Sequence, residues 1–453
     1  MSRTDGLYGA VQKRMIAEAL KLAASDNKRS IVRAFEIAER LTPENHKNKM
    51  RFVKAQVKAD HPALSVARHV CGLTPTCREG FINAFVFNAL LRGSQKRQDF
   101  LAREGIPTPF TILISPTMRC NLSCKGCYAG EYSPDSDMDT GLMQTIVDQA
   151  NDMGVYLFTI LGGEPFVRED VLDFCAANPD AYFQIYTNGT LLDDEAVARI
   201  VEIGNVAPMI SIEGDEPTTD ARRGAGVYRQ ILRAMDSLHD AGVLFGYSST
   251  VTRRNWRTLI SDEFVDPLVA RGASISWHFL YMPVGREPDT SLMLTPAERN
   301  EFREGIERLR STKAMFPVDF WGDAPYVEGC IAGKHYIHIN NDGWVEPCIF
   351  CHFATDSITD VSLKEAFGSP FFQEIRRRQP FNHNLLMPCM LIDNPHHSRE
   401  IMAVSGARPT HPGAEVMLTE LSGRLDDYAA EVDRVYAPVW SCMARGADEG
   451  ADA

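Results

Sequence analysis

The chain has 453 residues, of which 44% are hydrophobic and 24% are charged, a balance that is typical of folded globular proteins and excludes disorder as the main state. It contains 47 lysines and arginines against 60 aspartates and glutamates, for a formal net charge of −13. Because a strongly negative chain gains nothing from neutralising phosphate groups, we expect no nucleic-acid partner.

The first hundred residues predict a helical region. Apolar residues at positions 11–41 recur at three- and four-residue spacing, and a further helix is expected over about 79–103. Residues 1–105 carry 19 basic against 10 acidic residues, whereas the remainder carries 28 against 50, an asymmetry typical of a separate module. It indicates either a helical layer on an acidic body or a basic face that contacts an anionic partner or, peripherally, a membrane surface.

No targeting or membrane-spanning segment is visible in the sequence. The first fifteen residues lack a basic stretch followed by an apolar core. The longest apolar run, Phe81 to Leu91, contains two asparagines and is far shorter than the roughly 20 residues of a membrane span. We therefore expect a cytoplasmic protein, in which the eleven cysteines are better explained by metal binding or catalysis than by disulfides.

From residue 110 onward, short apolar runs alternate with helical stretches, which predicts an α/β fold with a parallel sheet and helices on its outer face. Six strands are expected, at 111–115, 157–161, 183–187, 209–212, 245–251 and 274–281. Several of these runs end in polar motifs, and the carboxyl ends of parallel strands are where such sheets collect their ligands. Periodicity alone leaves open whether the sheet closes into a barrel.

Three cysteines, Cys120, Cys124 and Cys127, directly follow the first expected strand. Their spacing allows one short loop to wrap three thiolates around a metal site. A zinc site usually has four protein ligands, whereas three ligands leave one metal position open, which favours an iron–sulfur cluster that binds a further molecule. Zinc remains the alternative.

The segment Met118–Tyr128, which contains this triplet, resembles the signature loop of the radical S-adenosylmethionine (SAM) superfamily. The resemblance covers about 110–290 and implies a partial (β/α)6 TIM-type barrel. It implies that the three cysteines are catalytic, holding a [4Fe–4S] cluster whose unique iron binds S-adenosylmethionine, and that a one-electron reductase such as a flavodoxin or ferredoxin supplies the electron. Gly126 departs from the pattern, since many members carry a bulky residue there.

The same resemblance assigns the S-adenosylmethionine contacts to the loops that follow the expected strands. Gly162, Gly163 and Glu164 match the GGEP motif of the family. The two glycines let the backbone approach the ligand closely, and the carboxylate offers an acceptor for the methionine ammonium. The other expected cofactor contacts are Asn188, Ser211, Glu213, Arg223 and Tyr281.

Each of these further contacts has an expected partner. Ser211 and Glu213 are placed to hydrogen-bond the ribose hydroxyls, and the resemblance brings Arg223 to the methionine carboxylate. Tyr281 belongs to a Tyr-x-Pro-Val-Gly stretch that lies near the adenine in similar proteins. His278, on the sixth strand, is either a contact inside the barrel or a buried core histidine.

A second group of cysteines follows near the C-terminus: Cys330, Cys348, Cys351 and Cys389. The Asn-Asp-Gly sequence at 341–343 predicts a hairpin between the first two. Their spacing resembles that of the SPASM and Twitch extensions, which implies a second, auxiliary [4Fe–4S] cluster without an open iron, for electron transfer or structure. A four-thiolate zinc site is the alternative, as is replacement of Cys389 by His352.

These observations predict four regions: a basic helical region over 1–105, the partial barrel over 106–315, a SPASM/Twitch-like domain over 316–395, and an irregular stretch with a final helix at about 414–436 over 396–453. The expected function is that of a radical SAM oxidoreductase or transferase, which cleaves S-adenosylmethionine to a 5′-deoxyadenosyl radical and abstracts hydrogen from its substrate. That substrate is a peptide or protein side chain, or alternatively a small molecule or isoprenoid-type lipid. An iron–sulfur electron carrier is the remote alternative, which the intact GGEP motif disfavours.

Overall fold

The computed structural model describes residues 36, 62, 64–133 and 135–451. The expected helices over 11–41, and most of the basic N-terminal region, therefore lie outside the described residues. Among the described residues, no helix combines the length and the apolar character that crossing a membrane requires.

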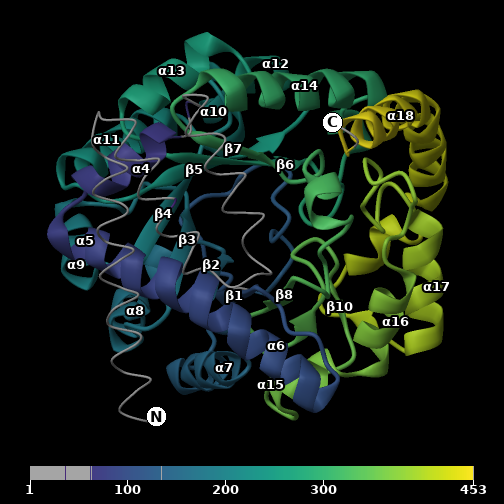
Figure 1. Ribbon diagram of the computed structural model, residues 1–453, viewed down its shortest axis with the longest axis horizontal. Helices are drawn as coiled ribbons and strands as arrows, with labels where there is room; N and C mark the ends of the chain where they lie inside the picture. Colours follow the sequence, from purple (N-terminus) through teal and green to yellow (C-terminus); the bar gives the residue numbers. More distant parts are fainter. Residues whose placement is uncertain (1–35, 37–61, 63, 134, 452–453) are drawn as a thin grey trace.

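The described N-terminal part is helical, as predicted. Helix α4 (Leu64–Gly72) is followed by a continuous run of α5 (Pro75–Gly80), the π-helix η1 (Phe81–Arg92) and α6 (Gly93–Glu104). The apolar run is thus a packed helix: Phe81 and Phe85 lie 5.8 and 5.6 Å from the Tyr182 ring. In Figure 1 this helical run crosses the front of the sheet. It covers the end of the barrel at which the parallel strands begin, because Tyr182 opens its strand.

All six expected strands are present in one parallel sheet. They are β1 (Thr111–Thr117), β2 (Leu157–Gly162), β3 (Tyr182–Thr187), β4 (Val206–Ser211), β5 (Gly246–Val251) and β6 (Ile275–Leu280). Three short strands extend its edges: β7 (Phe316–Asp319), which was not expected, pairs with β6, while β8 (Tyr336–Ile339) pairs with β1 and carries β9 (Val345–Glu346). The order β7-β6-β5-β4-β3-β2-β1-β8-β9 leaves the sheet open among the described residues, so the barrel is partial, as the resemblance implies.

The connecting helices lie on the outer face of the curved sheet (Figure 1). They are α7 (Thr140–Asp152), α8 (Val171–Ala177), α9 (Asp194–Ile203), α10 (Glu216–Arg223), α11 (Val227–Asp240), α12 (Trp256–Leu259), α13 (Asp262–Ala270) and α14 (Pro296–Thr312). Short 3-10 turns stand at η2 (Pro165–Val167), η3 (Thr290–Leu292) and η4 (Ala324–Val327). The start of α14 shows how the sequence sets such boundaries: Thr295 and Glu298 form a reciprocal capping box, and Pro296 occupies the first turn.

The C-terminal part packs beside β8, on the right in Figure 1. The predicted hairpin is confirmed: β8 and β9 are antiparallel, and Gly343 has a φ of 83° in the turn. The later elements are β10 (Phe353–Ala354), α15 (Leu363–Phe367), α16 (Pro370–Arg378), α17 (Pro395–Ser405), β11 (Arg408–Pro409), η5 (Ala414–Met417) and α18 (Ser422–Ala451). Two expectations were wrong here, because α17 occupies the stretch expected to be irregular and the final helix spans Ser422–Ala451.

Candidate active site

The loop after β1 places Cys120, Cys124 and Cys127 at one end of a cavity of about 860 Å³ inside the barrel. Its backbone is held by neighbouring loops: the Lys125 amide donates to the Arg222 carbonyl (3.1 Å) and the Arg286 amide donates to the Cys127 carbonyl (3.0 Å). Cys120 is exposed and the other two thiols are half-buried. The three predicted ligands therefore share one anchored loop that faces a chamber.

The Gly162–Glu164 segment lines the same cavity, at the carboxyl end of β2. The buried Glu164 carboxylate accepts hydrogen bonds from the Thr187 hydroxyl (2.7 Å), the Asn188 amide (2.7 Å) and the Phe166 amide (3.1 Å). Burial raises the pKa of Glu164 to about 6, against the lowering effect of these bonds. Since a carboxylate offers about four acceptor positions, it retains capacity for a donor in the cavity.

Steric space explains the paired glycines. Gly162 has a φ of 117°, a conformation that side chains of L-residues rarely adopt. A Cβ added to Gly163 would stand 2.1 Å from the Arg119 carbonyl oxygen, which accepts a hydrogen bond from the Glu164 amide. The two residues thus let the motif lie directly against the start of the cysteine loop.

Replacing Gly163 by alanine is expected to push this loop away from β2. We expect a loss of about 1–3 kcal/mol in the free energy of unfolding, together with a lower iron content after reconstitution. Gly423→Ala serves as the control, since no atom lies within 4 Å of its added Cβ. Equal stability and equal iron content in the two variants would contradict the steric role of Gly163.

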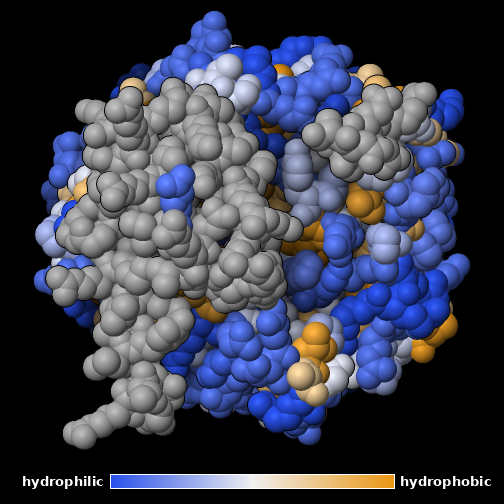
Figure 2. All heavy atoms as spheres, viewed as in Figure 1, coloured by the Kyte–Doolittle hydropathy of each residue, from blue (hydrophilic) through white to orange (hydrophobic). Residues whose placement is uncertain are grey.

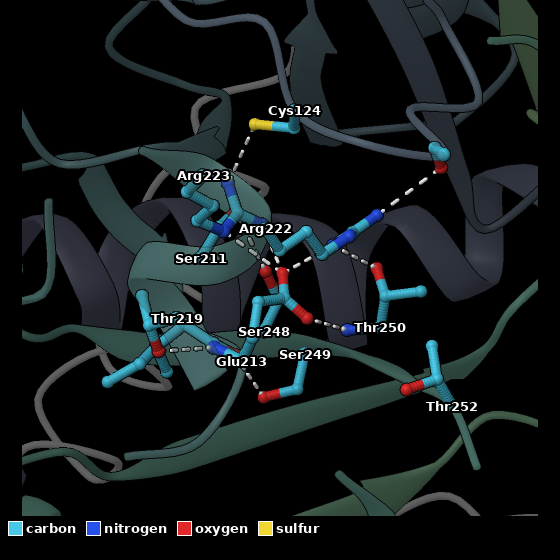
Figure 3. Close-up of polar contacts among 12 residues, drawn as sticks. Cys124, Ser211, Glu213, Thr219, Arg222, Arg223, Ser248, Ser249, Thr250 and Thr252 are labelled. Carbon is cyan, nitrogen blue, oxygen red and sulfur yellow. Dashed lines mark hydrogen bonds and ion pairs between the residues drawn. The ribbon is translucent and has the colours of Figure 1, made fainter. Parts of the chain in front are cut away.

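Two neighbouring arginines at the end of α10 form the most highly charged part of the cavity wall (Figure 3). Arg222 and Arg223 each contact the Glu213 carboxylate, at N–O distances of 2.5 Å. Arg223 also reaches the Cys124 sulfur at 4.0 Å. Glu213 itself is 1% exposed and its carboxylate accepts a further bond from the Thr250 amide.

This arrangement separates the predicted contacts by position. Asn188, Ser211, Arg223 and Tyr281 line the cavity, whereas Glu213 lies behind the arginines and is absent from the lining among the described residues. Its ion pairs make it a residue that positions Arg222 and Arg223. Asn188 donates to the Asn121 side chain (2.8 Å), which ties β3 to the cysteine loop.

Tyr281 accounts for the unusual Gly126. A Cβ on Gly126 would lie 2.9 Å from the Tyr281 ring, and Gly126 has a φ of 62°, so the ring fills the space that a bulky residue would take. The Tyr281 hydroxyl accepts a bond from the Asp289 amide (3.0 Å). His278 points to the other face of β6, where its Nε2 lies 3.0 Å from the Ser276 hydroxyl and its ring packs on Phe302; it is a core histidine.

The four C-terminal cysteines converge beside the β8–β9 hairpin. Each of the Cys330, Cys348 and Cys389 thiols is close enough to raise the pKa of the Cys351 thiol electrostatically, in addition to the effect of its burial. The Tyr336 hydroxyl donates to the Cys348 sulfur at 2.7 Å. Burial raises the pKa of Cys348 to about 11, so binding of iron to this thiol must release its proton.

His352 is engaged elsewhere and does not suit the alternative ligand role. Its Nδ1 is hydrogen-bonded to His411 and its Nε2 lies 2.6 Å from the Ile349 carbonyl oxygen. Within the described ranges, no group of three or more Cys, His, Asp or Glu side chains could hold a single metal ion.

A buried ion pair holds the last of these cysteines against the barrel. Arg299 of α14 contacts Asp393 at 2.5 and 3.2 Å, and the Asp393 carboxylate accepts from the Cys389 amide at 3.0 Å. Both side chains are at most 4% exposed.

Asp393→Asn is expected to destabilise the protein by about 3–5 kcal/mol, because it leaves the Arg299 charge buried without its partner. We also expect selective loss of iron from the C-terminal cysteines, since the Cys389 loop loses its anchor. Thermal unfolding and iron analysis would measure both effects. The exposed Asp427→Asn is the matched control, and an Asp393→Asn protein with its stability and iron intact would show that the pair does not hold this loop.

Comparison with known families agrees with these two cysteine sites. The model of the radical SAM superfamily matches residues 114–254, and that of an iron–sulfur cluster-binding domain, SPASM, matches residues 330–390. This is a radical SAM enzyme with a SPASM domain. Its radical SAM domain binds a [4Fe–4S] cluster and S-adenosylmethionine, and its SPASM domain binds auxiliary iron–sulfur clusters.

Three individual proteins that resemble this chain are at most 28% identical to it over the aligned residues. The AdoMet-dependent heme synthase of Nitratidesulfovibrio vulgaris is 28% identical over 61% of this chain and 84% of its own length. The mycofactocin maturase MftC of Mycobacterium ulcerans is also 28% identical, over 61% of this chain and 79% of its own. Streptococcus suis SuiB bound to S-adenosylmethionine superposes with a TM-score of 0.55 at 20% identity, covering 66% of this chain and 76% of SuiB, which supports the fold of this radical SAM enzyme.

Some residues of the site were missed by sequence reasoning. Arg222 was not among the expected contacts, yet both Arg222 and Arg223 line the cavity. The Thr187 hydroxyl donates to Glu164, and its place directly before Asn188 was an available signal. The aromatic residues that line the barrel, such as Phe279 and Phe350, carried no sequence signal that separates them from core residues.

Proposed function

We propose that Cys120, Cys124 and Cys127 hold the catalytic cluster of this enzyme, and that S-adenosylmethionine binds beside them at one end of the barrel cavity. The observation that carries this proposal is that the three thiols, the Gly162–Glu164 segment and Arg223 line a single chamber. When bound, the reduced cluster supplies the electron that divides S-adenosylmethionine into methionine and the 5′-deoxyadenosyl radical, which abstracts hydrogen from the substrate.

The chain's own residues would orient the cofactor. Glu164 offers its remaining acceptor positions to the methionine ammonium, and Arg223 offers its guanidinium to the carboxylate. Ser211, whose hydroxyl lies 3.3 Å from that of Ser248, is placed for the ribose, and Tyr281 for the adenine. Enclosure within the barrel keeps solvent from the reacting centre.

The exposure of Cys120 indicates the side from which an electron donor would reach the catalytic cluster. Cys120 is the exposed member of its triplet, so we expect a one-electron reductase such as a flavodoxin or ferredoxin to approach on that side. Cys330, Cys348, Cys351 and Cys389 would hold one auxiliary [4Fe–4S] cluster whose four protein ligands leave no open iron, in a domain that we place at 316–395. Its role is then electron transfer or structure.

The cellular setting stays an expectation. All eleven cysteines are free of disulfides, as suits a reducing compartment, and we place the enzyme in the cytoplasm. Peripheral membrane contact through the basic region 1–105 concerns residues that lie mostly outside the described ones. The proteins that resemble this chain differ in what they bind. One is a heme synthase, and another, SuiB, has been crystallised with its precursor peptide.

The proposal is tested by anaerobic incubation of the reconstituted, dithionite-reduced protein with S-adenosylmethionine. We expect 5′-deoxyadenosine, quantified by liquid chromatography and mass spectrometry. If none forms, the incubation is repeated with cell extract, which supplies the substrate. Absence of 5′-deoxyadenosine in both incubations, from protein with a verified reduced cluster, would overturn the proposed function.

A further inference from the structure

The cavity continues well beyond the cysteine loop, and its deeper walls are aromatic. Phe279 of β6 stacks on Trp277, with ring centroids 6.2 Å apart and an interplanar angle of 6°. It also contacts Tyr186 of β3 at 6.2 Å and Phe320 at 5.1 Å. Phe350, from the turn between Cys348 and Cys351, closes the belt at 6.5 Å from Phe279. All five rings line the chamber.

Charge is confined to the two ends of this chamber. Among the described lining residues, the lysines and arginines are Arg222 and Arg223, and both are paired with Glu213. Between the arginines and the opposite end, the polar lining includes the uncharged Thr111, Thr159 and Gln184. Lys334 and Arg97 lie near His335 but outside the lining, and both are engaged: Lys334 with Glu328 (3.7 Å) and Arg97 with the Gly154 carbonyl oxygen (2.8 Å). A carboxylate or phosphate held there would therefore lack a free cation to offset its desolvation.

The opposite end opens to solvent through hydrophobic residues. Tyr326 and Val327 of η4 line the cavity and are 73% and 43% exposed. This mouth also contains Glu328 and His335. The Glu328 side chain is 86% exposed. Burial lowers the pKa of His335, which favours its neutral form. Figure 2 shows hydrophobic residues among hydrophilic ones near the middle of this face, beside the grey atoms. Exposed apolar groups at a cavity mouth are typical of a ligand entrance.

We propose that the substrate of this enzyme is an uncharged, largely apolar small molecule, which enters between η4 and η1 and packs along the belt of Tyr186, Trp277, Phe279, Phe320 and Phe350. A peptide fits less well, because each of its buried backbone amides and carbonyls needs a hydrogen-bond partner, and the belt offers few. The chamber volume lies within the range of small-molecule sites. This inference rests on the proposed function, since it assigns the space next to the S-adenosylmethionine site.

The test uses N-phenyl-1-naphthylamine, an uncharged apolar probe, with the anaerobic holoenzyme and S-adenosylmethionine. Bound and free probe are separated by ultrafiltration. We expect saturable binding of about one probe per chain. Gln184→Arg, which places a permanent charge in the chamber lining, should weaken binding about tenfold or more, whereas Gln184→Met, of similar size and apolar, should bind at least as tightly as the parent. Gln373→Glu, in α16, controls for a change of charge elsewhere.

Two results would overturn the inference: no saturable binding to the parent, or equal binding by the parent and Gln184→Arg. If Gln184→Arg does not fold, the Met variant decides, because clearly weaker binding to Gln184→Met contradicts an apolar chamber. A second arm compares 5′-deoxyadenosine formation with an organic-solvent extract of cells and with their peptide fraction. Stimulation by the peptide fraction alone overturns the substrate class while leaving the proposed function intact, and probe binding does not depend on catalysis.

Discussion

Replacing Cys120, Cys124 and Cys127 together by alanine is expected to abolish 5′-deoxyadenosine formation and to halve the iron content. Anaerobically purified parent should contain about eight irons per chain, and the triple variant about four, because the four C-terminal cysteines would still hold their own cluster. Iron analysis, electron paramagnetic resonance and the nucleoside assay measure these effects.

Cys442→Ala is the matched control for this experiment, since Cys442 is an exposed thiol of α18. It should retain all the iron and the full rate. If the triple variant keeps eight irons, or if the parent holds four irons and one zinc, the assignment of the two cysteine groups to two iron–sulfur clusters is wrong.

Glu164→Gln is expected to weaken the binding of S-adenosylmethionine by about 10–100-fold, the equivalent of a lost hydrogen bond to a charged group. The amide keeps the size of the side chain, but the Thr187 hydroxyl and the Asn188 backbone amide bond to different carboxylate oxygens, so the single amide oxygen replaces only one of the two acceptors. The variant therefore loses the negative charge proposed to face the methionine ammonium together with one acceptor of the bonds that hold this loop.

Equilibrium dialysis with labelled S-adenosylmethionine measures this effect on protein with equal iron content. Glu169→Gln, an exposed residue just beyond η2, is the control and should bind as the parent does. Tight binding by Glu164→Gln would place the ammonium elsewhere in the chamber.

The sequence predicted the cysteine loop, the barrel strands and the GGEP motif because each depends on local chemistry: thiol spacing, apolar runs and paired glycines. It could not predict which side of a strand faces the lumen. Parallel strands are buried on both faces and carry no alternation, so His278 was as good a candidate for the cavity as Phe279. In the structure, the His278 ring packs on Phe302 of α14, outside the barrel, whereas Phe279 lines the cavity.

Long-range pairing also escaped the sequence. The pairing of Glu213 with two arginines nine and ten residues later, at the end of α10, could not be predicted from the local sequence; its contact with the ribose stays a prediction. Helix α17 was missed for a different reason. Irregular chain was expected from residue 396, although Pro395 in the first turn and the left-handed Gly406 after the last turn mark the ends of a helix.

The open side of the barrel has a consequence for how this protein could diversify. Phe350 belongs to the turn that carries Cys348 and Cys351, yet its ring stands in the chamber beside Phe279 and 5.7 Å from the Tyr128 ring, which follows the first cysteine loop. The SPASM domain is therefore one wall of the reaction chamber as well as the holder of a cluster. A chimera that exchanges this domain for that of a relative would inherit a new chamber shape along with the new redox centre, so substrate preference and electron transfer would change together.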